Sequence, residues 1–94
     1  MNKQPDRYLI AFDDTHVAIH TEKLVQEAGC KARLVGTPES ISASCGLALL
    51  VKREEMAIVW DLVQEHQLIE EIAPYCVYRT GAHKTYEPYQ PKED

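Results

Sequence analysis

The order of short apolar segments and helical segments constrains the fold of this chain more than any other feature. Runs rich in strand-forming residues alternate with segments whose apolar residues recur at helical spacing. They predict strand, helix, strand, strand, helix and strand, in this order, over 8–12, 17–28, 31–35, 47–51, 54–67 and 75–78. This order is typical of the ferredoxin-like split fold. We therefore expect an α+β protein: a two-layer ferredoxin-like sandwich with both helices on one face of a four-stranded antiparallel sheet.

The third predicted strand, 47–51, is apolar on both of its alternating faces, which is typical of a central strand. The second strand carries two cations and the fourth begins after Pro74, so both suit an edge. The right-handed crossover then places the loop before Leu47 at the sheet end where the first helix begins. We expect Cys45, which lies in this loop, to approach the start of that helix.

At 94 residues, the chain is long enough for one domain. We expect a frayed N-terminus over 1–6, a single ferredoxin-like domain over 7–79 and a flexible polar tail over 80–94. The tail segment has two prolines, five charged residues and little apolar content, so the prediction is that folding does not need it.

The net charge of -5 disfavours non-specific binding to nucleic acid, which requires clustered Lys and Arg. The acidity is uneven, because residues 1–53 hold seven Lys or Arg against six Asp or Glu. No apolar run approaches the roughly 18 residues of a membrane span, and the first six residues lack the apolar core of a signal peptide. The expectation is a cytoplasmic protein that binds neither nucleic acid nor membrane.

Cys45 is the cysteine with the most suggestive surroundings. The chain has three cysteines and no C-x-x-C pair, so a disulfide framework is not expected. The small neighbours Ser44 and Gly46 leave the Cys45 thiol accessible, and the N-terminus of the first helix, with Thr15 and His16, is a candidate activator because it can stabilise a thiolate. The hydroxyls of Ser42 and Ser44 are candidate donors to an anionic sulfur. The opposing interpretation is a small, packed cysteine at the start of a strand.

Several motifs resemble the selenium/sulfur carrier protein-like family of small prokaryotic proteins. They are Thr15-His16, Glu22-Lys23-Leu24, Glu27-Ala28-Gly29, Thr37-Pro38 and above all Ile41-Ser42-Ala43-Ser44-Cys45-Gly46-Leu47-Ala48-Leu49. The resemblance covers roughly residues 7–79. It implies that Cys45 carries persulfide or selenide equivalents between a donor and an acceptor protein, and it favours a carrier over a stand-alone enzyme. The segment from Thr80 onward, Cys30 and Cys76 lie outside the shared motifs, so the resemblance gives them no role.

Other chemistries fit these residues less well. His16 and His20 share a helix face near Cys45, but no fourth ligand stands at a fixed spacing, so no metal and no cofactor are expected. A hydrolase built on Cys45, His16 and an aspartate would need a substrate cleft that so short a chain hardly offers. The main alternative is a non-enzymatic regulatory or assembly module with a structural or ligand-contacting Cys45. In either case the helix-free sheet face could pair two copies into a homodimer.

Overall fold

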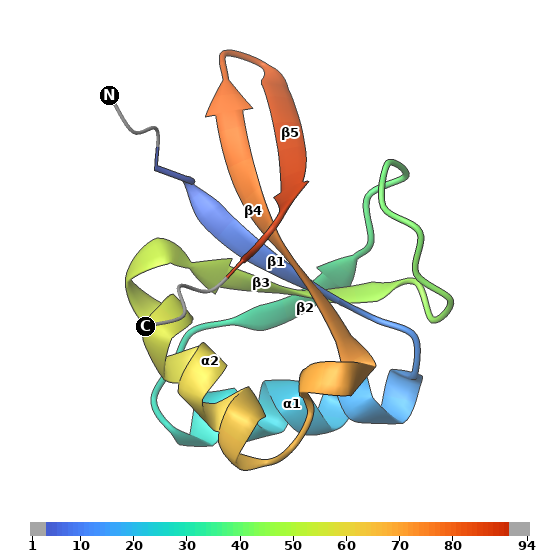
Figure 1. Cartoon of the computed structure of the whole chain (residues 1–94), viewed down its shortest axis with the longest axis vertical. Coiled ribbons are helices and arrows are strands. Elements are labelled where there is room, and N and C mark those ends of the chain that lie inside the picture. Colours follow the sequence, from blue (N-terminus) through green and yellow to red (C-terminus); the bar gives the residue numbers. More distant parts are fainter. Residues whose placement is uncertain (1–3, 91–94) are drawn as a thin grey trace.

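The computed structural model describes residues 4–90, in which two helices lie on one side of a twisted sheet (Figure 1). The sheet strands are β1 (Arg7–Phe12), β2 (Arg33–Gly36), β3 (Leu47–Lys52), β4 (Ile72–Thr80) and β5 (His83–Pro88). The helices are α1 (Thr15–Glu27) and α2 (Met56–Glu65), with short 3-10 helices η1 (Arg53–Glu55) and η2 (Ile69–Glu71). None of the helices in the described part of the chain is long and apolar enough to cross a membrane.

The strands form one antiparallel sheet in the order β2-β3-β1-β4-β5. The predicted α+β class and antiparallel sheet are therefore confirmed, and the first and third strands are internal as expected. The predicted number of strands was wrong, because the sheet has five strands and not four. The ferredoxin-like arrangement remains a prediction.

The fifth strand, β5, lies inside the segment that we expected to be a flexible polar tail. Its residues are almost all exposed and polar, so no apolar alternation marks it in the sequence. It forms because its backbone pairs with β4 from Thr80↔His83 to Tyr75↔Pro88. The prediction of a tail over 80–94 was therefore wrong for the residues of β5, while residues 91–94 lie outside the described part of the chain. Residues 1–3 of the expected frayed N-terminus also lie outside it.

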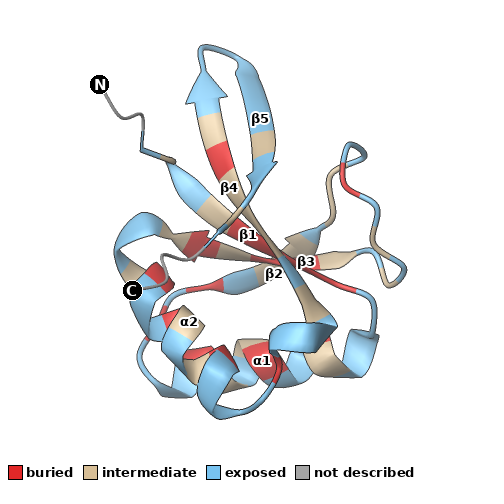
Figure 2. Cartoon of the chain, viewed as in Figure 1, coloured by how far each residue is buried: buried red, intermediate tan, exposed pale blue. Residues whose placement is uncertain are grey.

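The core lies between the helices and the sheet (Figure 2). From the sheet side, Ile10, Phe12 and Leu49 are each at most 1% exposed. From the helix side, Val25 and Val59 are fully buried against them. The outer end of the β4–β5 hairpin extends past the helices and is largely exposed (Figure 2).

Tyr89, just after β5, fixes the end of the described chain to this core. Its N–H donates to the Pro74 carbonyl over 2.9 Å. Its ring makes edge-to-face contacts with Tyr8, at 5.3 Å between centroids, and with Trp60, at 5.2 Å. The C-terminal segment is thus packed against both the sheet and α2. The prediction that the fourth strand lies at an edge was wrong, because Pro74 lies within β4 and a neighbouring strand flanks β4 on each side.

Candidate functional site

The loop between β2 and β3, residues 37–46, is closed at its base by backbone hydrogen bonds. The Thr37 N–H donates to the Gly46 carbonyl over 3.0 Å, and the Gly46 N–H donates to the Ala43 carbonyl over 3.3 Å. Gly46 has a φ of 75°, in the left-handed region that side chains with a Cβ rarely adopt. This glycine therefore allows the turn that places Cys45 directly before β3.

The loop touches both faces of the sheet. Ile41 is 7% exposed and packs with Leu9, Ala11 and Ala48 on the face without helices. Cys45 packs instead against the core between the sheet and the helices. The loop therefore straddles the end of the sheet, and Cys45 occupies its helix side.

The Cys45 sulfur lies between a backbone acceptor and a backbone donor. The thiol donates to the Phe12 carbonyl over 3.1 Å, with the Leu47 carbonyl more distant at 3.8 Å. The Leu47 N–H donates to the sulfur over 3.4 Å. The sulfur therefore both donates and accepts a hydrogen bond, and its partners are backbone atoms. Cys45 is half-buried, so its small neighbours do not leave it fully open to solvent.

The start of α1 lies beside the loop, as the topology predicts. The Ser44 N–H donates to Asp13 Oδ1 over 3.1 Å. Asp14 caps the helix, because its Oδ1 accepts the N–H of His16 at 2.7 Å and of Val17 at 3.3 Å. Both amides are therefore taken by the Asp14 carboxylate and are not available to the sulfur.

The other predicted site residues lie on this loop or at the start of α1, and in the described part of the chain none of their side chains forms a hydrogen bond with the sulfur. Ser42, Ser44 and Gly46 are exposed on the loop, and Thr15 and His16 are exposed on the first turn of α1. Within residues 4–90, every hydrogen bond of the Cys45 sulfur is to backbone, and none is to a side chain of these residues. The structure therefore brings the predicted residues to one end of the sheet, but among the described residues their side chains form no hydrogen bond with the thiol.

The other two thiols are in different environments. Burial raises the pKa of Cys30, and the nearby Glu55 carboxylate adds to this effect. Burial also raises the pKa of Cys76; a hydrogen bond with Tyr78 opposes this shift and the Glu87 carboxylate reinforces it. Both thiols are therefore less ionised at neutral pH than an exposed cysteine.

Thr37 is a residue of the loop to which the sequence analysis assigned no role. Its hydroxyl is buried and has no hydrogen-bond partner, and it is the one buried side-chain polar atom of this kind in the part of the chain that the structure describes. A buried hydroxyl without a partner is costly and calls for an explanation. The Thr37-Pro38 pair was part of the family resemblance, which is the sequence signal that could have drawn attention to it.

The structure offers two further observations on binding. No group of three or more metal-ligating side chains occurs among the described residues. A cavity of about 690 Å³ lies on the helix-free face of the sheet. Cys45 does not line this cavity, whereas Gly36 and Pro38, at the start of its loop, do.

Comparison with known proteins gives one family. The family model described as "Putative Se/S carrier protein-like" matches residues 7–74, from the start of β1 into β4. The matched part includes the loop, Cys45 and both helices, and it ends before β5. Searches of the curated proteins and of the solved structures returned no match to the chain.

Proposed function

Because the chain belongs to the Se/S carrier protein-like family, we propose that Cys45 holds a sulfur or selenium atom as a persulfide or its selenium counterpart. The atom is then passed to an acceptor protein. The observation that carries this proposal is the half-buried Cys45 sulfur, which accepts the Leu47 N–H at 3.4 Å. Cys45 and Leu47 lie inside the part of the chain that matches the family. Ser44 and Gly46, which flank Cys45, are small enough for a second protein to approach the sulfur.

The transfer step is an exchange between sulfur atoms. The Cys45 sulfur loses its proton and attacks the outer sulfur of a persulfide on a donor protein. A new S–S bond forms at Cys45, the donor's S–S bond breaks, and the donor cysteine leaves as a thiolate. No external oxidant is needed, because the outer sulfur moves in its existing oxidation state. Unloading repeats the step, with a thiolate of the acceptor attacking the outer atom on Cys45.

The residues around Cys45 have distinct proposed parts in this step. Loss of the thiol proton removes the hydrogen bond to the Phe12 carbonyl, while the Leu47 N–H can still donate to the anion. His16, exposed on the first turn of α1 with Thr15, accepts the departing proton. The exposed hydroxyls of Ser42 and Ser44 then donate to the outer sulfur or selenium atom. Gly46 has no side chain that could obstruct the donor or acceptor protein as it approaches Cys45.

A structural role of Cys45 is the second candidate. The thiol donates to the Phe12 carbonyl and packs against the core, which is what a cysteine that only stabilises the loop would do. Cys45→Ser separates the two functions, because a serine hydroxyl can keep the bond to Phe12 but cannot carry sulfur. If Cys45 carries sulfur, the Cys45→Ser variant can no longer be loaded but keeps its stability. If Cys45 is purely structural, the unaltered protein is not loaded with sulfur in the first place.

The first test is loading followed by mass spectrometry. The protein is treated with inorganic polysulfide and the mass added at each cysteine is located by digestion. We expect one added sulfur on Cys45, none in the Cys45→Ser variant, and unchanged loading in the matched Cys30→Ser and Cys76→Ser variants. Loading that follows Cys76 and not Cys45 would refute the proposal.

The second test compares alkylation rates of the three thiols in the folded protein near neutral pH. Cys45 should react first, since burial raises the pKa of Cys30 and Cys76 and Cys30 is only 6% exposed. His16→Ala should slow the Cys45 reaction near neutral pH more than at high pH, where hydroxide removes the proton. Equal rates for Cys45 and Cys76 would favour the structural role.

A further inference from the structure

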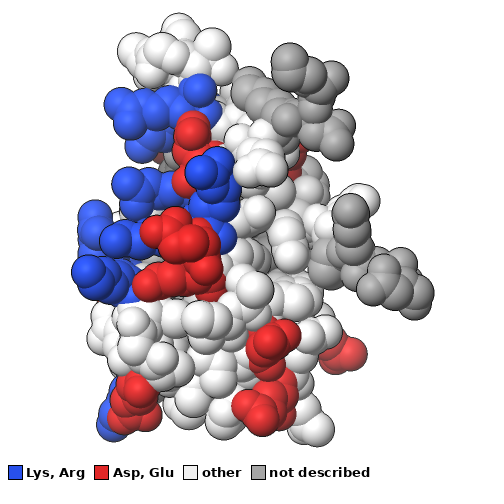
Figure 3. All heavy atoms as spheres, turned by 90° about the vertical axis from the view of Figure 1, so that its left-hand side faces the viewer, with Lys and Arg blue, Asp and Glu red and all other residues white. Residues whose placement is uncertain are grey.

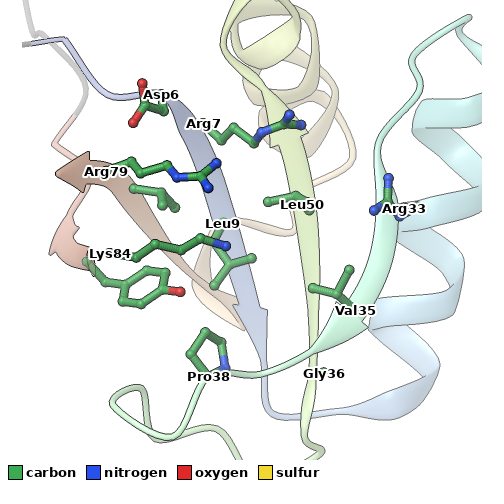
Figure 4. A pocket seen from close by; sticks show the side chains of 12 residues that line it. Asp6, Arg7, Leu9, Arg33, Val35, Gly36, Pro38, Leu50, Arg79 and Lys84 are labelled. Atoms are coloured by element: carbon green, nitrogen blue, oxygen red, sulfur yellow. The ribbon is translucent and has the colours of Figure 1, made fainter. Parts of the chain in front are cut away.

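The helix-free face of the sheet carries a cluster of cations that the Cys45 site does not use. Four cationic side chains surround the cavity of about 690 Å³: Arg7, Arg33, Arg79 and Lys84, which we call the basic face (Figure 4). The floor between them is apolar and comes from Leu9, Val35, Leu50 and Val77. Figure 3 shows Lys and Arg side chains gathered along one side of the molecule, with Asp and Glu side chains beside them, although the whole chain has a net charge of -5.

The positions of these cations destabilise the sheet, because three of them lie opposite another cation on a neighbouring strand. Arg79 lies directly opposite Lys84, and Arg7 lies directly opposite Lys52. Like charges at opposite positions of antiparallel strands destabilise the pair. Within residues 4–90 none of the basic face cations has an acidic partner at ion-pair distance, and Asp6 is the only acidic residue in the cavity lining. A bound anion would relieve this repulsion.

The distance between the cations across the sheet indicates whether the ligand of the basic face is compact or extended. Arg33 lies on β2 and Lys84 on β5, at opposite edges of the sheet. Neighbouring strands are about 4.8 Å apart, so four strand spacings separate the backbones of β2 and β5 by roughly 19 Å. A single small anion cannot reach both, whereas an extended chain can.

We propose that the basic face binds an extended acidic segment of a partner protein, with apolar side chains on the Leu9 and Leu50 floor and carboxylates on the surrounding cations. All four cations are exposed, which suits the rim of a protein interface better than a small-anion site. The floor is mainly aliphatic, with Tyr86 as its one aromatic residue, so it lacks the stacking platform of a single-stranded nucleic-acid site. Gly36 and Pro38 border the cavity, so the bound segment lies next to the loop that ends at Cys45. The inference is independent of sulfur chemistry at Cys45.

The test is a binding titration with defined probes. A fluorescein-labelled peptide of alternating glutamate and leucine is the main probe, and a peptide of alternating glutamine and leucine is its uncharged match. Labelled oligothymidylate and inorganic phosphate test the other anions. Fluorescence anisotropy gives the affinity, and amide NMR spectra of the isotope-labelled protein locate the contact. The Cys45→Ser variant is titrated in parallel, so that loss of sulfur loading and loss of docking are separated.

The key variant reverses two charges and keeps their mutual repulsion. Arg79→Glu with Lys84→Glu replaces one like-charged cross-strand pair by another, so its effect on the sheet is matched. We expect this variant to bind the glutamate peptide about ten-fold more weakly, which corresponds to about 1.4 kcal/mol. The matched control Lys23→Glu, on the exposed side of α1, should change the affinity less than about two-fold. Added salt should weaken binding to the unaltered protein.

Each other outcome overturns the proposal. Absence of binding to the glutamate peptide, or equal binding of the glutamine peptide, would show that acidic segments are not recognised. Tighter binding of oligothymidylate that is lost in the double variant would assign the face to nucleic acid. Displacement of the peptide by low concentrations of phosphate would assign it to a small anion. NMR shifts that avoid Leu9, Leu50 and Val77 would place the peptide elsewhere.

Discussion

The Cys45 loop and the β4–β5 hairpin differ in how their sequences reveal what they do. The loop, residues 37–46, carries chemically distinctive residues, lies inside the region that matches the family and is held by a few backbone hydrogen bonds. The hairpin carries exposed polar residues and lies almost entirely outside that region, yet it adds a strand to the sheet and leads to Tyr89 on the core. The residue types of the loop mark it in the sequence, whereas the hairpin is held by backbone pairing and by the contacts of Tyr89 with Tyr8 and Trp60.

The difference also separates two surfaces. Cys45 lies on the helix side at one end of the sheet, and the hairpin supplies Arg79 and Lys84 to the basic face on the other side. A partner could therefore be held by the hairpin while its reactive group approaches the loop. The predictions below test how much of the molecule depends on each region.

The largest expected effect is that of removing the hairpin's second strand. Truncation after Arg79 deletes β5 and Tyr89, and leaves β4 as an unpaired edge. We expect the free energy of unfolding to fall by about 4 kcal/mol, in the range of deleting a large aromatic side chain from a core. Urea unfolding followed by circular dichroism measures it. An unchanged midpoint would restore the interpretation of residues 80–94 as a dispensable tail.

The next largest effect on the free energy of unfolding should come from removing the Tyr89 ring, which packs the end of the hairpin against the core. Tyr89→Ala removes the edge-to-face contacts with Tyr8 and Trp60, at 5.3 and 5.2 Å. Because Tyr89 is only half-buried, the expected loss of stability is about 2 kcal/mol. The matched control Tyr89→Phe keeps the ring and should cost less than about 0.5 kcal/mol. Trp60 fluorescence reports the contact directly, and an emission spectrum unchanged in Tyr89→Ala would contradict the packing.

Most of the fold was predictable because its signals are local. The apolar run 47–51 indicated an internal strand, and β3 is one. The second helix was predicted over 54–67 and is shorter at both ends: the chain forms η1 at Arg53–Glu55, and α2 spans Met56–Glu65. β5 was missed because it depends on backbone pairing with β4 and on the packing of the half-buried Tyr86 and Tyr89, and neither leaves an apolar pattern.

The candidate site was predictable in its location and not in its contacts. The crossover argument placed the loop beside the start of α1, where Ser44 bonds to Asp13. The expected help from the helix N-terminus was not foreseeable in detail, because the sequence does not show that the Asp14 carboxylate takes the amides of His16 and Val17. The basic face could not be predicted, since its cations come from four strands whose register only the folded sheet determines.

A smaller effect should appear at alkaline pH. Burial raises the pKa of Cys30 and Cys76 above the usual value of 9.0, so the unfolded chain loses these protons before the folded protein does. The resulting stabilisation is complete below pH 9 and is lost as the pH rises through the folded-state pKa values. Burial also raises the pKa of Tyr8, which extends the loss to higher pH.

The measurement is the urea midpoint at a series of pH values from about 7.5 to 10.5, a range that spans the usual thiol and phenol pKa values. We expect the free energy of unfolding to decline across this range, and to decline less steeply in Cys30→Ala. The two proteins are compared by how steeply the free energy of unfolding changes with pH. Their absolute stabilities are not compared, because Cys30→Ala also leaves a small cavity. A midpoint that stays constant or rises with pH would contradict the raised pKa of the buried Cys30 thiol and of the half-buried Cys76 thiol.

The smallest expected effect concerns the loop and tests whether the buried Thr37 hydroxyl, which has no hydrogen-bond partner among the described residues, has a function. Thr37→Val replaces the hydroxyl by a methyl of similar size, so the cost of burying Thr37 Oγ1 without a partner disappears. We expect a stability gain of up to about 1 kcal/mol, measured by urea unfolding, with Thr37→Ser as the control that keeps the hydroxyl. If the hydroxyl instead serves the carried atom, the loaded Thr37→Val protein should also release sulfur faster, which mass spectrometry over time can follow. A loss of stability in Thr37→Val would mean that the hydroxyl has a partner in solution, and the loop would then be held together more tightly than its few hydrogen bonds indicate.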